Sequence, residues 1–461
     1  MKFYLIKNDM LFILALSAFI HLWNPIGFPD LFFDEGVYIR RAMSVLNGFN
    51  IQEAYFYDHP FFGQIFLAGI LTAVNFPNVI DESFYNAYLI PRLIVGSLAV
   101  IDTFLIYKIA YKQYNRRVAI IASLLFAVMP MTWLLRRVLL DSLLLPFLLS
   151  SILFAIYKKG NITFLLLSGI SLGLAIFTKI PIFVLIPLVS LLVYKNTKNL
   201  RLLGIWFIPV MLIPLIWPLQ SIIANQFDLW LNDVLWQTRR VSEGGMSSIT
   251  ALFIKFDPIL FFLGISGFCY AIIKRDLMII FFAIPFILYL SFIGYTQYFH
   301  WIPILPAFAI AGGVLLDKIV KKYTFLLVLM LGFGFISTTL LITTNVTSAQ
   351  FMAMKFVAEN IDNEILLASP VYSWVFIDVY NMPLDYTHAL FYPVDDNILL
   401  IMGEHFKFDS KYYKQLQLLY NKTEVIGIFR GEVYKYDTNI YPYTNMEVNY
   451  EGSLIEVRRS Q

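Results

Sequence analysis

Long apolar runs alternate with short polar segments through the first three quarters of the chain. Because a helix of roughly 20 apolar residues crosses a bilayer, this pattern predicts about eleven transmembrane helices. Their approximate ranges are 9–26, 85–107, 117–135, 139–157, 162–178, 180–194, 202–219, 251–273, 277–295, 301–317 and 323–344. Two connecting segments are long, 27–86 and 220–248. The first contains an apolar piece, 61–76, that suits a helix lying along the membrane surface.

The pattern changes near residue 345. From there to residue 461 the chain is polar and rich in tyrosine. Helix-like pieces (348–361, 409–422) alternate with short strand-like pieces (364–369, 425–430, 433–437, 454–459). This alternation predicts a small α/β domain outside the membrane. We therefore expect a polytopic α-helical membrane protein with a transmembrane domain over 1–344 and a C-terminal domain over 345–461.

The charges fit a membrane protein and predict its orientation. Hydrophobic residues make up 59% of the chain and charged residues only 14%, whereas soluble domains are about 25% charged. Along the chain, alternate loops between the predicted helices are rich in lysine and arginine, as cytoplasmic loops are. We expect the N-terminus inside and, with an odd number of helices, the C-terminus outside. The basic clusters are Lys2 and Lys7; Lys108, Lys112, Arg116 and Arg117; Lys158 and Lys159; Lys195, Lys198 and Arg201; Lys274 and Arg275; and Lys318, Lys321 and Lys322.

Cysteine usage and net charge exclude several classes of function. The single cysteine, Cys269, lies in an apolar run, so neither a disulfide within the chain nor a zinc site built from cysteines can form. The formal net charge of +3 gives no indication of nucleic acid as a partner. Membrane lipids are the partners that this composition indicates.

The first long connecting segment carries the densest set of candidate functional residues. Asp34 and Glu35 follow two phenylalanines at the start of a predicted helix. On that helix Asp34, Tyr38 and Arg41 share one face, because positions i, i+4 and i+7 recur on one side. The simplest structural explanation is that Asp34 caps the helix and that Glu35 favours its N-terminal dipole. Two further polar residues lie later in the same segment, Asp58 and His59.

More polar residues gather at helix ends that are predicted to lie on the same, outer side. An ionisable side chain at membrane depth costs roughly 2.5–3.5 kcal/mol, so each one needs an explanation. Snorkelling to lipid headgroups explains any single arginine or lysine. Several cations and a carboxylate pair on one face instead suit a lipid phosphate held by the cations, with a carboxylate to deprotonate an acceptor hydroxyl. The residues are Arg92, Arg136, Arg137, Asp141, Lys179, Tyr298 and His300, with Arg239 in the second long segment.

The order of these motifs resembles that of the GT-C membrane glycosyltransferases, in particular the branch of protein O-mannosyltransferases and the lipid A aminoarabinose transferase. Members carry an acidic pair after the first span, an HPP-like motif, an arginine shortly before an aspartate in the fourth span, and a G-x-x-x-x-TK stretch. The matching residues are Asp34-Glu35, His59-Pro60-Phe61, Arg137 to Asp141, and Gly173 to Lys179. This chain departs from the pattern in two places. Phe61 replaces the second proline, and the arginine is doubled as Arg136-Arg137, which leaves open which one faces the site.

The resemblance implies a metal-independent, inverting transfer of a sugar from a polyprenyl-phosphate carrier to an acceptor hydroxyl on the outer face of the cell membrane. It implies Asp34 as the general base, with Glu35 assisting it or binding the acceptor. Lys179 and Arg137 become contacts to the donor phosphate, for which Arg136 and Arg92 are further candidates. No cofactor is expected. The candidates for substrate binding are Tyr38, Arg41, Asp58, His59, Asp141, Tyr298, His300 and Arg239.

Three alternatives stay open. A lipid flippase or solute transporter would place its polar residues near the bilayer midplane, often in repeated halves, whereas here they gather at one face without an evident repeat. A glycan polymerase or ligase would use a diphosphate-linked oligosaccharide. An oligosaccharyltransferase of the GT-C class would bind a divalent metal, with Asp34, Glu35 and Asp58 as candidate ligands. The sequence identifies neither the sugar nor the acceptor, which is a protein, a glycan or a lipid.

Overall fold

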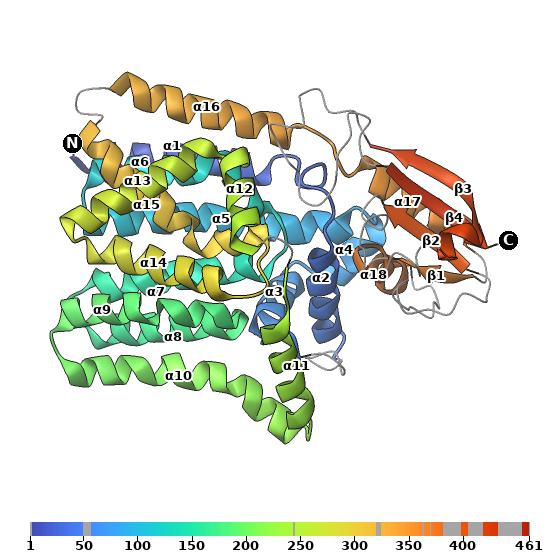
Figure 1. The fold of residues 1–461 in the computed structure, drawn as a ribbon, viewed down its shortest axis with the longest axis horizontal. Helices are drawn as coiled ribbons and strands as arrows, with labels where there is room; N and C mark the ends of the chain where they lie inside the picture. The colour runs from blue at the N-terminus through green and yellow to red at the C-terminus, as the bar shows by residue number, and fades with distance from the viewer. Residues whose placement is uncertain are drawn as a thin grey trace. The chain divides into compact units, whose positions relative to one another are not determined.

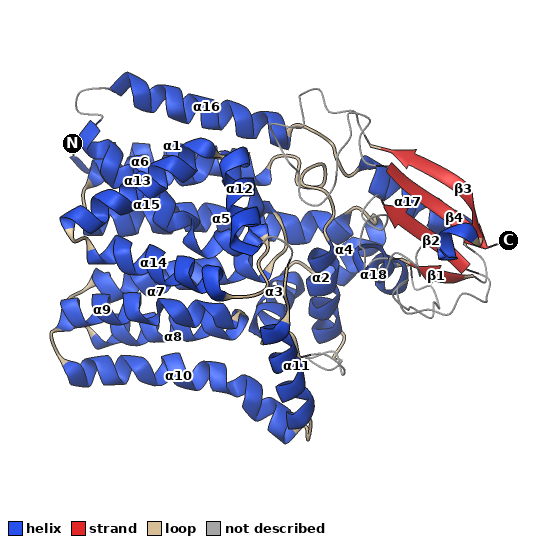
Figure 2. Ribbon diagram, viewed as in Figure 1, coloured by secondary structure: helices blue, strands red, loops and turns tan. Residues whose placement is uncertain are grey.

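The computed structural model describes residues 2–48, 57–242, 245–319, 324–361, 364–368, 370–380, 398–403, 418–431 and 454–460. Helices dominate it, and its strands all come after residue 364 (Figure 1, Figure 2). The chain divides into two compact units. Unit 1 comprises Met1–Leu22, Asn50–Phe66 and Val95–Thr339, and unit 2 comprises Trp23–Phe49, Leu67–Ile94 and Leu340–Gln461.

Unit 1 is a bundle of helices that run side by side (Figure 1). α7 packs against α8, α8 against α10, and α15 against both α6 and α13. The helices wholly or mainly in this unit are α1 (Lys2–Leu22), α5 (Asn86–Gln113), α6 (Arg116–Val128), η1 (Pro130–Arg136), α7 (Leu140–Tyr157), α8 (Ile162–Thr178), η2 (Ile180–Leu185), α9 (Ile186–Thr197), α10 (Leu200–Ile223), α11 (Phe227–Arg239), α12 (Gly245–Phe256), α13 (Pro258–Lys274), α14 (Leu277–Phe292), η3 (Tyr298–Ile304), α15 (Leu305–Ile319) and α16 (Thr324–Ile342).

Each predicted transmembrane range coincides with a helix, a pair of successive helices or a shorter apolar helix. Among the described residues, six helices are long and apolar enough to cross a membrane, or up to eight if each of two bent pairs is one span. The chain is therefore a multi-pass membrane protein, as predicted. The number eleven and the orientation stay predictions.

Two of the predicted spans are broken in the structure. The range 117–135 bends by 68° between α6 and η1, and the range 251–273 bends by 116° between α12 and α13. Each second helix starts with a proline, Pro130 or Pro258. Proline has no backbone N–H to continue the preceding helix but suits the first turn of a new one. The predicted ranges 117–135 and 251–273 each consist of two helices, and the apolar pattern alone did not show these breaks.

Unit 2 contains a four-stranded sheet, in which β1 and β2 are parallel and the remaining neighbours antiparallel in the order β1-β2-β4-β3. α17 packs on β3 and β4, and α18 packs on α2. Leu367, Ile398, Leu400 and Leu419 form a buried core under the sheet. The elements mainly in this unit are α2 (Phe33–Leu46), α3 (Phe62–Ala73), α4 (Phe76–Glu82), α17 (Ser348–Asn360), β1 (Ile365–Leu367), α18 (Pro370–Trp374), η4 (Val375–Val379), β2 (Ile398–Gly403), β3 (Thr423–Arg430) and β4 (Leu454–Ser460).

The predicted C-terminal α/β domain is confirmed in its main elements. The helix predicted over 348–361 is α17, and three of the predicted strands are β1, β3 and β4. β2 was not predicted. The strand predicted over 433–437 lies outside the described residues, as does most of the helix predicted over 409–422, of which 418–421 are helical.

The predicted domain boundary at residue 344 differs from the structure, in which the C-terminal part forms one unit with much of the first long segment. Asn24 Nδ2 donates hydrogen bonds to the carbonyl oxygens of Ile342 (3.0 Å) and Thr344 (3.2 Å). The N–H of Val346 donates to the carbonyl of Gly27 at 2.8 Å. These partners are more than 300 residues apart, so a local sequence pattern could not reveal them.

Candidate active site

A buried ion pair joins α7 and α8 in unit 1. Lys179 caps the C-terminus of α8, and Asp141 lies in the first turn of α7. The Nζ of Lys179 is 2.6 Å from Oδ2 of Asp141, and only 4% and 3% of the two residues is exposed. The same Nζ lies 5.1 Å from the centre of the Phe299 ring. Burying two charges is expensive even when they are paired, so this pair is a candidate for function.

The two arginines of the doubled motif are turned in different directions. Arg136 ends η1, and its guanidinium donates to the carbonyl of Ile20 in α1. Arg137 follows η1 and lies 5.3 Å over the ring of Trp133. Trp133 is also stacked with the Tyr298 ring, at 6.1 Å between centres. Arg137 therefore shares an aromatic support with another predicted site residue, which favours it as the arginine of the site.

Asp257, which the sequence analysis did not single out, joins the two broken spans. It caps the N-terminus of α13 through Oδ1, which accepts a hydrogen bond from the N–H of Leu260 (2.9 Å). Its Oδ2 accepts from the N–H of Met131 in η1 (3.1 Å). The preceding residue, Phe256, packs on Trp133 at 5.7 Å. A single carboxylate, 1% exposed, thus fixes the segment that carries the two arginines. In the sequence, the acidic residue directly before Pro258 in an apolar run was the available sign that a new helix starts here.

Further basic residues surround His300, which lies at the start of η3. Its Nδ1 accepts a hydrogen bond from the N–H of Gln297 at 3.1 Å. Lys179, His59 and Arg240 all lie close enough to act electrostatically on its ring. The predicted site residues Lys179, His59 and His300 are therefore gathered in unit 1, together with Arg240, which was not predicted.

The segment that carries His59 is held at several points. Oδ1 of Asp58 accepts a hydrogen bond from the N–H of His59 at 2.9 Å. The N–H of Tyr57 donates to Oδ2 of Asp233 in α11 at 2.6 Å. Tyr57 and Phe61 belong to a buried aromatic cluster. Because of these contacts the histidine motif and α11 have a defined position within unit 1.

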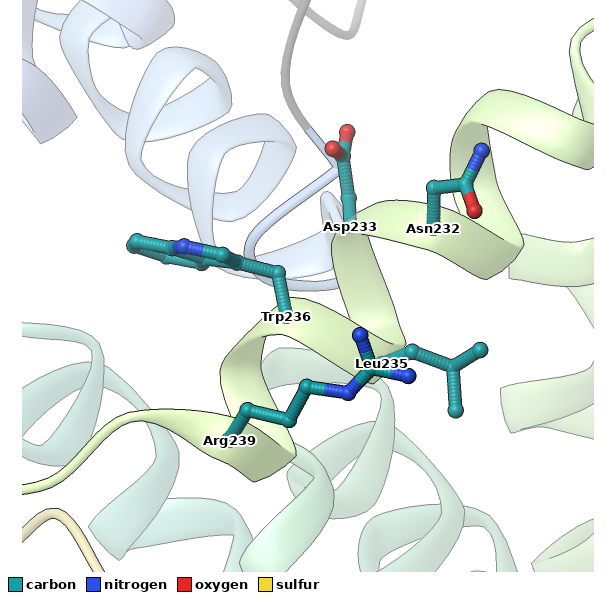
Figure 3. Close-up of a pocket in the computed structure, with 5 residues that line it drawn as sticks. All are labelled: Asn232, Asp233, Leu235, Trp236 and Arg239. Atoms are coloured by element: carbon teal, nitrogen blue, oxygen red, sulfur yellow. The ribbon is translucent and has the colours of Figure 1, made fainter.

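The adjacent arginines at the end of α11 differ in their surroundings. The guanidinium carbon of Arg240 lies 3.7 Å over the ring of Tyr295 and 5.0 Å from that of Trp236. Arg239, the residue predicted for substrate binding, lines a pocket on α11 (Figure 3). Of these two arginines, Arg240 is the one that acts electrostatically on His300.

In unit 2, Glu35 and Arg92 form a fully buried, bidentate ion pair. Nε of Arg92 donates to Oε1 of Glu35 (3.0 Å) and Nη2 to Oε2 (2.6 Å). The other N–H groups of Arg92 donate to the carbonyls of Pro25, Pro29 and Asp30. All five donors of a guanidinium are then in use. The pair braces the loop before α2, and the roles predicted for Arg92 at the donor phosphate and for Glu35 beside Asp34 stay predictions.

The neighbouring Asp34 is less buried than Glu35. Asp34 is half-buried in the first turn of α2, and Tyr38 and Arg41 follow on the same helix with 5% and 4% exposure. The chain before α2 is bonded to α17, where Gln350 accepts from the N–H of Leu31 (2.8 Å) and donates to its carbonyl (3.1 Å). Unit 2 therefore holds Asp34 on a rigid helix start.

Unit 2 also holds a buried phenol beside this loop. The Gln350 side chain donates to the hydroxyl of Tyr372 at 3.2 Å. Burial raises the pKa of Tyr372 above its ordinary value, and the charge of Asp30 adds to this. The phenol stays protonated at neutral pH and serves as a hydrogen-bonding support for the loop.

No three His, Cys, Asp or Glu side chains lie close enough to hold a metal ion within the described part of the chain. Of the three residues considered as metal ligands, Asp34 and Glu35 lie in unit 2 and Asp58 lies in unit 1. The expectation of a metal-independent reaction stays a prediction.

Residues 58–219 match the model of the family described as dolichyl-phosphate-mannose-protein mannosyltransferase. No curated protein matches the chain in sequence. Among solved structures, ArnT from Cupriavidus metallidurans is similar both in its apo state (14% identity) and bound to undecaprenyl phosphate (13% identity). Both matches have a TM-score of 0.62 and cover 98% of this chain and 97% of ArnT. The archaeal oligosaccharyltransferase AglB from Archaeoglobus fulgidus, in complex with an inhibitory peptide and a dolichol-phosphate, matches with a TM-score of 0.55 at 12% identity, over 82% of this chain and 64% of AglB.

The chain therefore has the fold of the GT-C membrane glycosyltransferases over nearly its whole length. The part that is also similar in sequence to the protein mannosyltransferases includes Asp141 and Lys179, whereas Asp34 precedes it. The resemblance predicted from the first 200 residues is confirmed, and the structural match extends it through the C-terminal sheet.

Proposed function

We propose that this protein transfers a single sugar from a polyprenyl-phosphate carrier to an acceptor hydroxyl, with inversion at the anomeric carbon, on the outer face of the cell membrane. The observation that carries the proposal is the buried Lys179–Asp141 pair on a GT-C fold. The match to ArnT bound to undecaprenyl phosphate supports a lipid-phosphate donor. The outer location rests on the positive-inside pattern of the loops.

In the proposed reaction the oxygen of the acceptor hydroxyl attacks the anomeric carbon, and the bond from that carbon to the phosphate oxygen breaks. The hydroxyl proton passes to the carboxylate of Asp34, which acts as general base. The leaving lipid phosphate gains negative charge. Lys179 and Arg137 stabilise that charge, since cations fixed in a dry site act more strongly than they would in water. Asp141 holds the Nζ of Lys179 in place.

The direct test is transfer in vitro. The purified protein in nanodiscs is given polyprenyl-phosphate mannose, glucose or aminoarabinose with a mixed acceptor pool of membrane protein, glycan and lipid. We expect the labelled sugar to reach one acceptor class and free polyprenyl phosphate to appear in equal amount. Transfer only from a lipid diphosphate oligosaccharide would identify a polymerase or ligase instead. Movement of an intact labelled lipid across the bilayer without cleavage would identify a flippase.

Asp257 gives the proposal a second test. In Asp257→Asn one carboxylate oxygen becomes an amide N–H donor, which cannot accept the hydrogen bond from Met131. Losing such a buried bond costs about 1–3 kcal/mol of stability. Because η1 carries the arginines, we also expect the KM for the lipid-phosphate donor to rise about tenfold, with a smaller change in kcat.

The matched control for this variant is Asp276→Asn. Asp276 caps the next helix, α14, by accepting hydrogen bonds from the N–H groups of Met278 and Ile279. It lies at the opposite end of the α13–α14 pair, away from η1. We expect a similar loss of thermal stability with an unchanged KM. Equal effects of the two variants on KM would show that Asp257 contributes only to stability.

A further inference from the structure

A pocket of about 390 Å³ opens on α11, the helix of the second long connecting segment. Figure 3 shows the side chains that line it, along successive turns of the helix. Asn232, Leu235, Trp236 and Arg239 recur every three or four residues, which places them on one face, and Asp233 lies between this face and the side bonded to Tyr57. Binding sites for small ligands start near 300 Å³ and combine an apolar or aromatic wall with a few polar groups. The lining residues are Asn232, Asp233, Leu235, Trp236 and Arg239.

The opposite face of α11 anchors the helix. Leu229, Trp230 and Val234 pack against the buried aromatic cluster that includes Tyr57 and Trp217. The rings of Trp217 and Trp230 meet edge to face, with 5.5 Å between their centres. α11 is therefore a fixed support, and the pocket is not a by-product of a loosely attached helix.

The aromatic wall of the pocket is held rigid although it is exposed. Trp236 is 47% exposed. The guanidinium of Arg240 lies 5.0 Å from its ring and is itself stacked on Tyr295 at 3.7 Å. Nη1 of Arg240 also donates to Oε1 of Gln237 at 3.0 Å. An indole fixed in this way offers a flat apolar surface without losing side-chain entropy when a ligand binds.

The polar groups of the pocket are of both kinds, donors and acceptors. Asp233 is oriented by the N–H of Tyr57, which donates to its Oδ2 at 2.6 Å. Within the described residues its Oδ1 has no hydrogen-bond partner. Asn232 beside it, and Arg239 further along the helix, supply N–H donors (Figure 3). A pocket that offers a carboxylate, an amide and a guanidinium can bind hydroxyl groups, which donate and accept at once.

We propose that this pocket binds a sugar residue of the acceptor, so that the acceptor substrate is a glycan or carries one. This inference rests on the proposed glycosyltransferase function. The apolar C–H face of a pyranose ring stacks on Trp236, and its hydroxyls bond to Asp233, Asn232 and Arg239. A lipid headgroup is the competing occupant, because tryptophan and arginine are common at the membrane surface. The carboxylate of Asp233 disfavours it, since it would repel an anionic phosphate.

Binding is tested separately from transfer, by saturation-transfer NMR of methyl α-mannoside, methyl α-glucoside and methyl β-galactoside on the protein in neutral nanodiscs. We expect at least one glycoside to bind. We expect Trp236→Ala to lower the affinity for this glycoside about tenfold, as the loss of a central aromatic contact does. Trp236→Phe keeps a stacking surface and should retain part of the affinity. The control is Trp23→Ala, which removes a tryptophan of similar exposure (54%) outside the pocket.

The outcomes separate this inference from the proposed function. Glycoside binding that Trp236→Ala weakens about tenfold, in a protein without transferase activity, would support the pocket and overturn the proposed function. Transfer activity without glycoside binding, or equal binding by Trp236→Ala and wild type, would overturn the pocket. So would quenching by brominated lipids of the part of the fluorescence that Trp236→Phe removes, if no glycoside relieves it, because the indole would then be a membrane anchor.

Discussion

Replacing Lys179 by methionine is expected to lower kcat/KM for the lipid-phosphate donor by about 10²–10³-fold, the loss typical when one fixed donor to a developing negative charge is removed. The methionine keeps the length and apolar stem of lysine but has no charge. The measurement is the initial rate of release of polyprenyl phosphate at several donor concentrations. An unchanged rate would show that the charge of Lys179 serves only to neutralise Asp141.

The single variant also leaves Asp141 buried without its partner, which costs about 3–5 kcal/mol of stability. A second variant, Lys179→Met with Asp141→Leu, separates this effect from catalysis. Replacing both charges by apolar side chains of similar size is often neutral or stabilising, so we expect its thermal stability to return to that of the wild type. We expect its activity to stay lost, because the cation is still missing. Recovery of activity in the double variant would contradict the role of Lys179 in the site.

Sequence patterns predicted most of the helices because hydrophobic runs of bilayer length leave few alternatives. They failed at residues 129–130 and 256–258, where the chain turns at a proline within a longer apolar run. The turn at the second place depends on Asp257, whose partner Met131 lies 126 residues earlier in the chain. Such a contact leaves no periodic signal in a single sequence. β2 was missed for a related reason, since an isolated apolar run of six residues (398–403) fits a strand or a helix.

For the site, the sequence supplied residue types but not their partners. The carboxylates Asp34 and Glu35 are adjacent and look equivalent in the sequence. Arg92, 57 residues further along, makes them different by engaging both oxygens of Glu35. Likewise only the ring of Trp133 under Arg137 favours one of the two adjacent arginines over the other. Spatial partners of this kind decide which of two neighbouring charged groups is structural and which is available for chemistry.

Asp34→Asn is expected to lower kcat by about 10²–10⁴-fold, the usual contribution of a general base. The amide has the same shape as the carboxylate, so the fold and the KM for the donor should change little. The measurement is kcat at saturating donor and acceptor, with thermal unfolding of the same sample. The adjacent variant Glu35→Gln should show the opposite result, because it removes one charge of the buried pair with Arg92. We expect it to lose about 3–5 kcal/mol of stability, with the transferase activity of the remaining folded protein largely kept.

A chelator decides between the two roles open to Asp34. If the carboxylate acts as a base without a metal, wild-type transfer is indifferent to EDTA and Asp34→Asn stays inactive with or without added Mg²⁺ or Mn²⁺. If it is instead a metal ligand, EDTA stops the wild type, excess Mn²⁺ restores it, and the chemistry moves towards that of an oligosaccharyltransferase. Transfer by Asp34→Asn at the wild-type rate would leave Asp34 only the favourable interaction of an acidic side chain in the first turn of α2. The proton acceptor would then have to be sought among the carboxylates of unit 1, starting with Asp58, because Asp141 is engaged by Lys179.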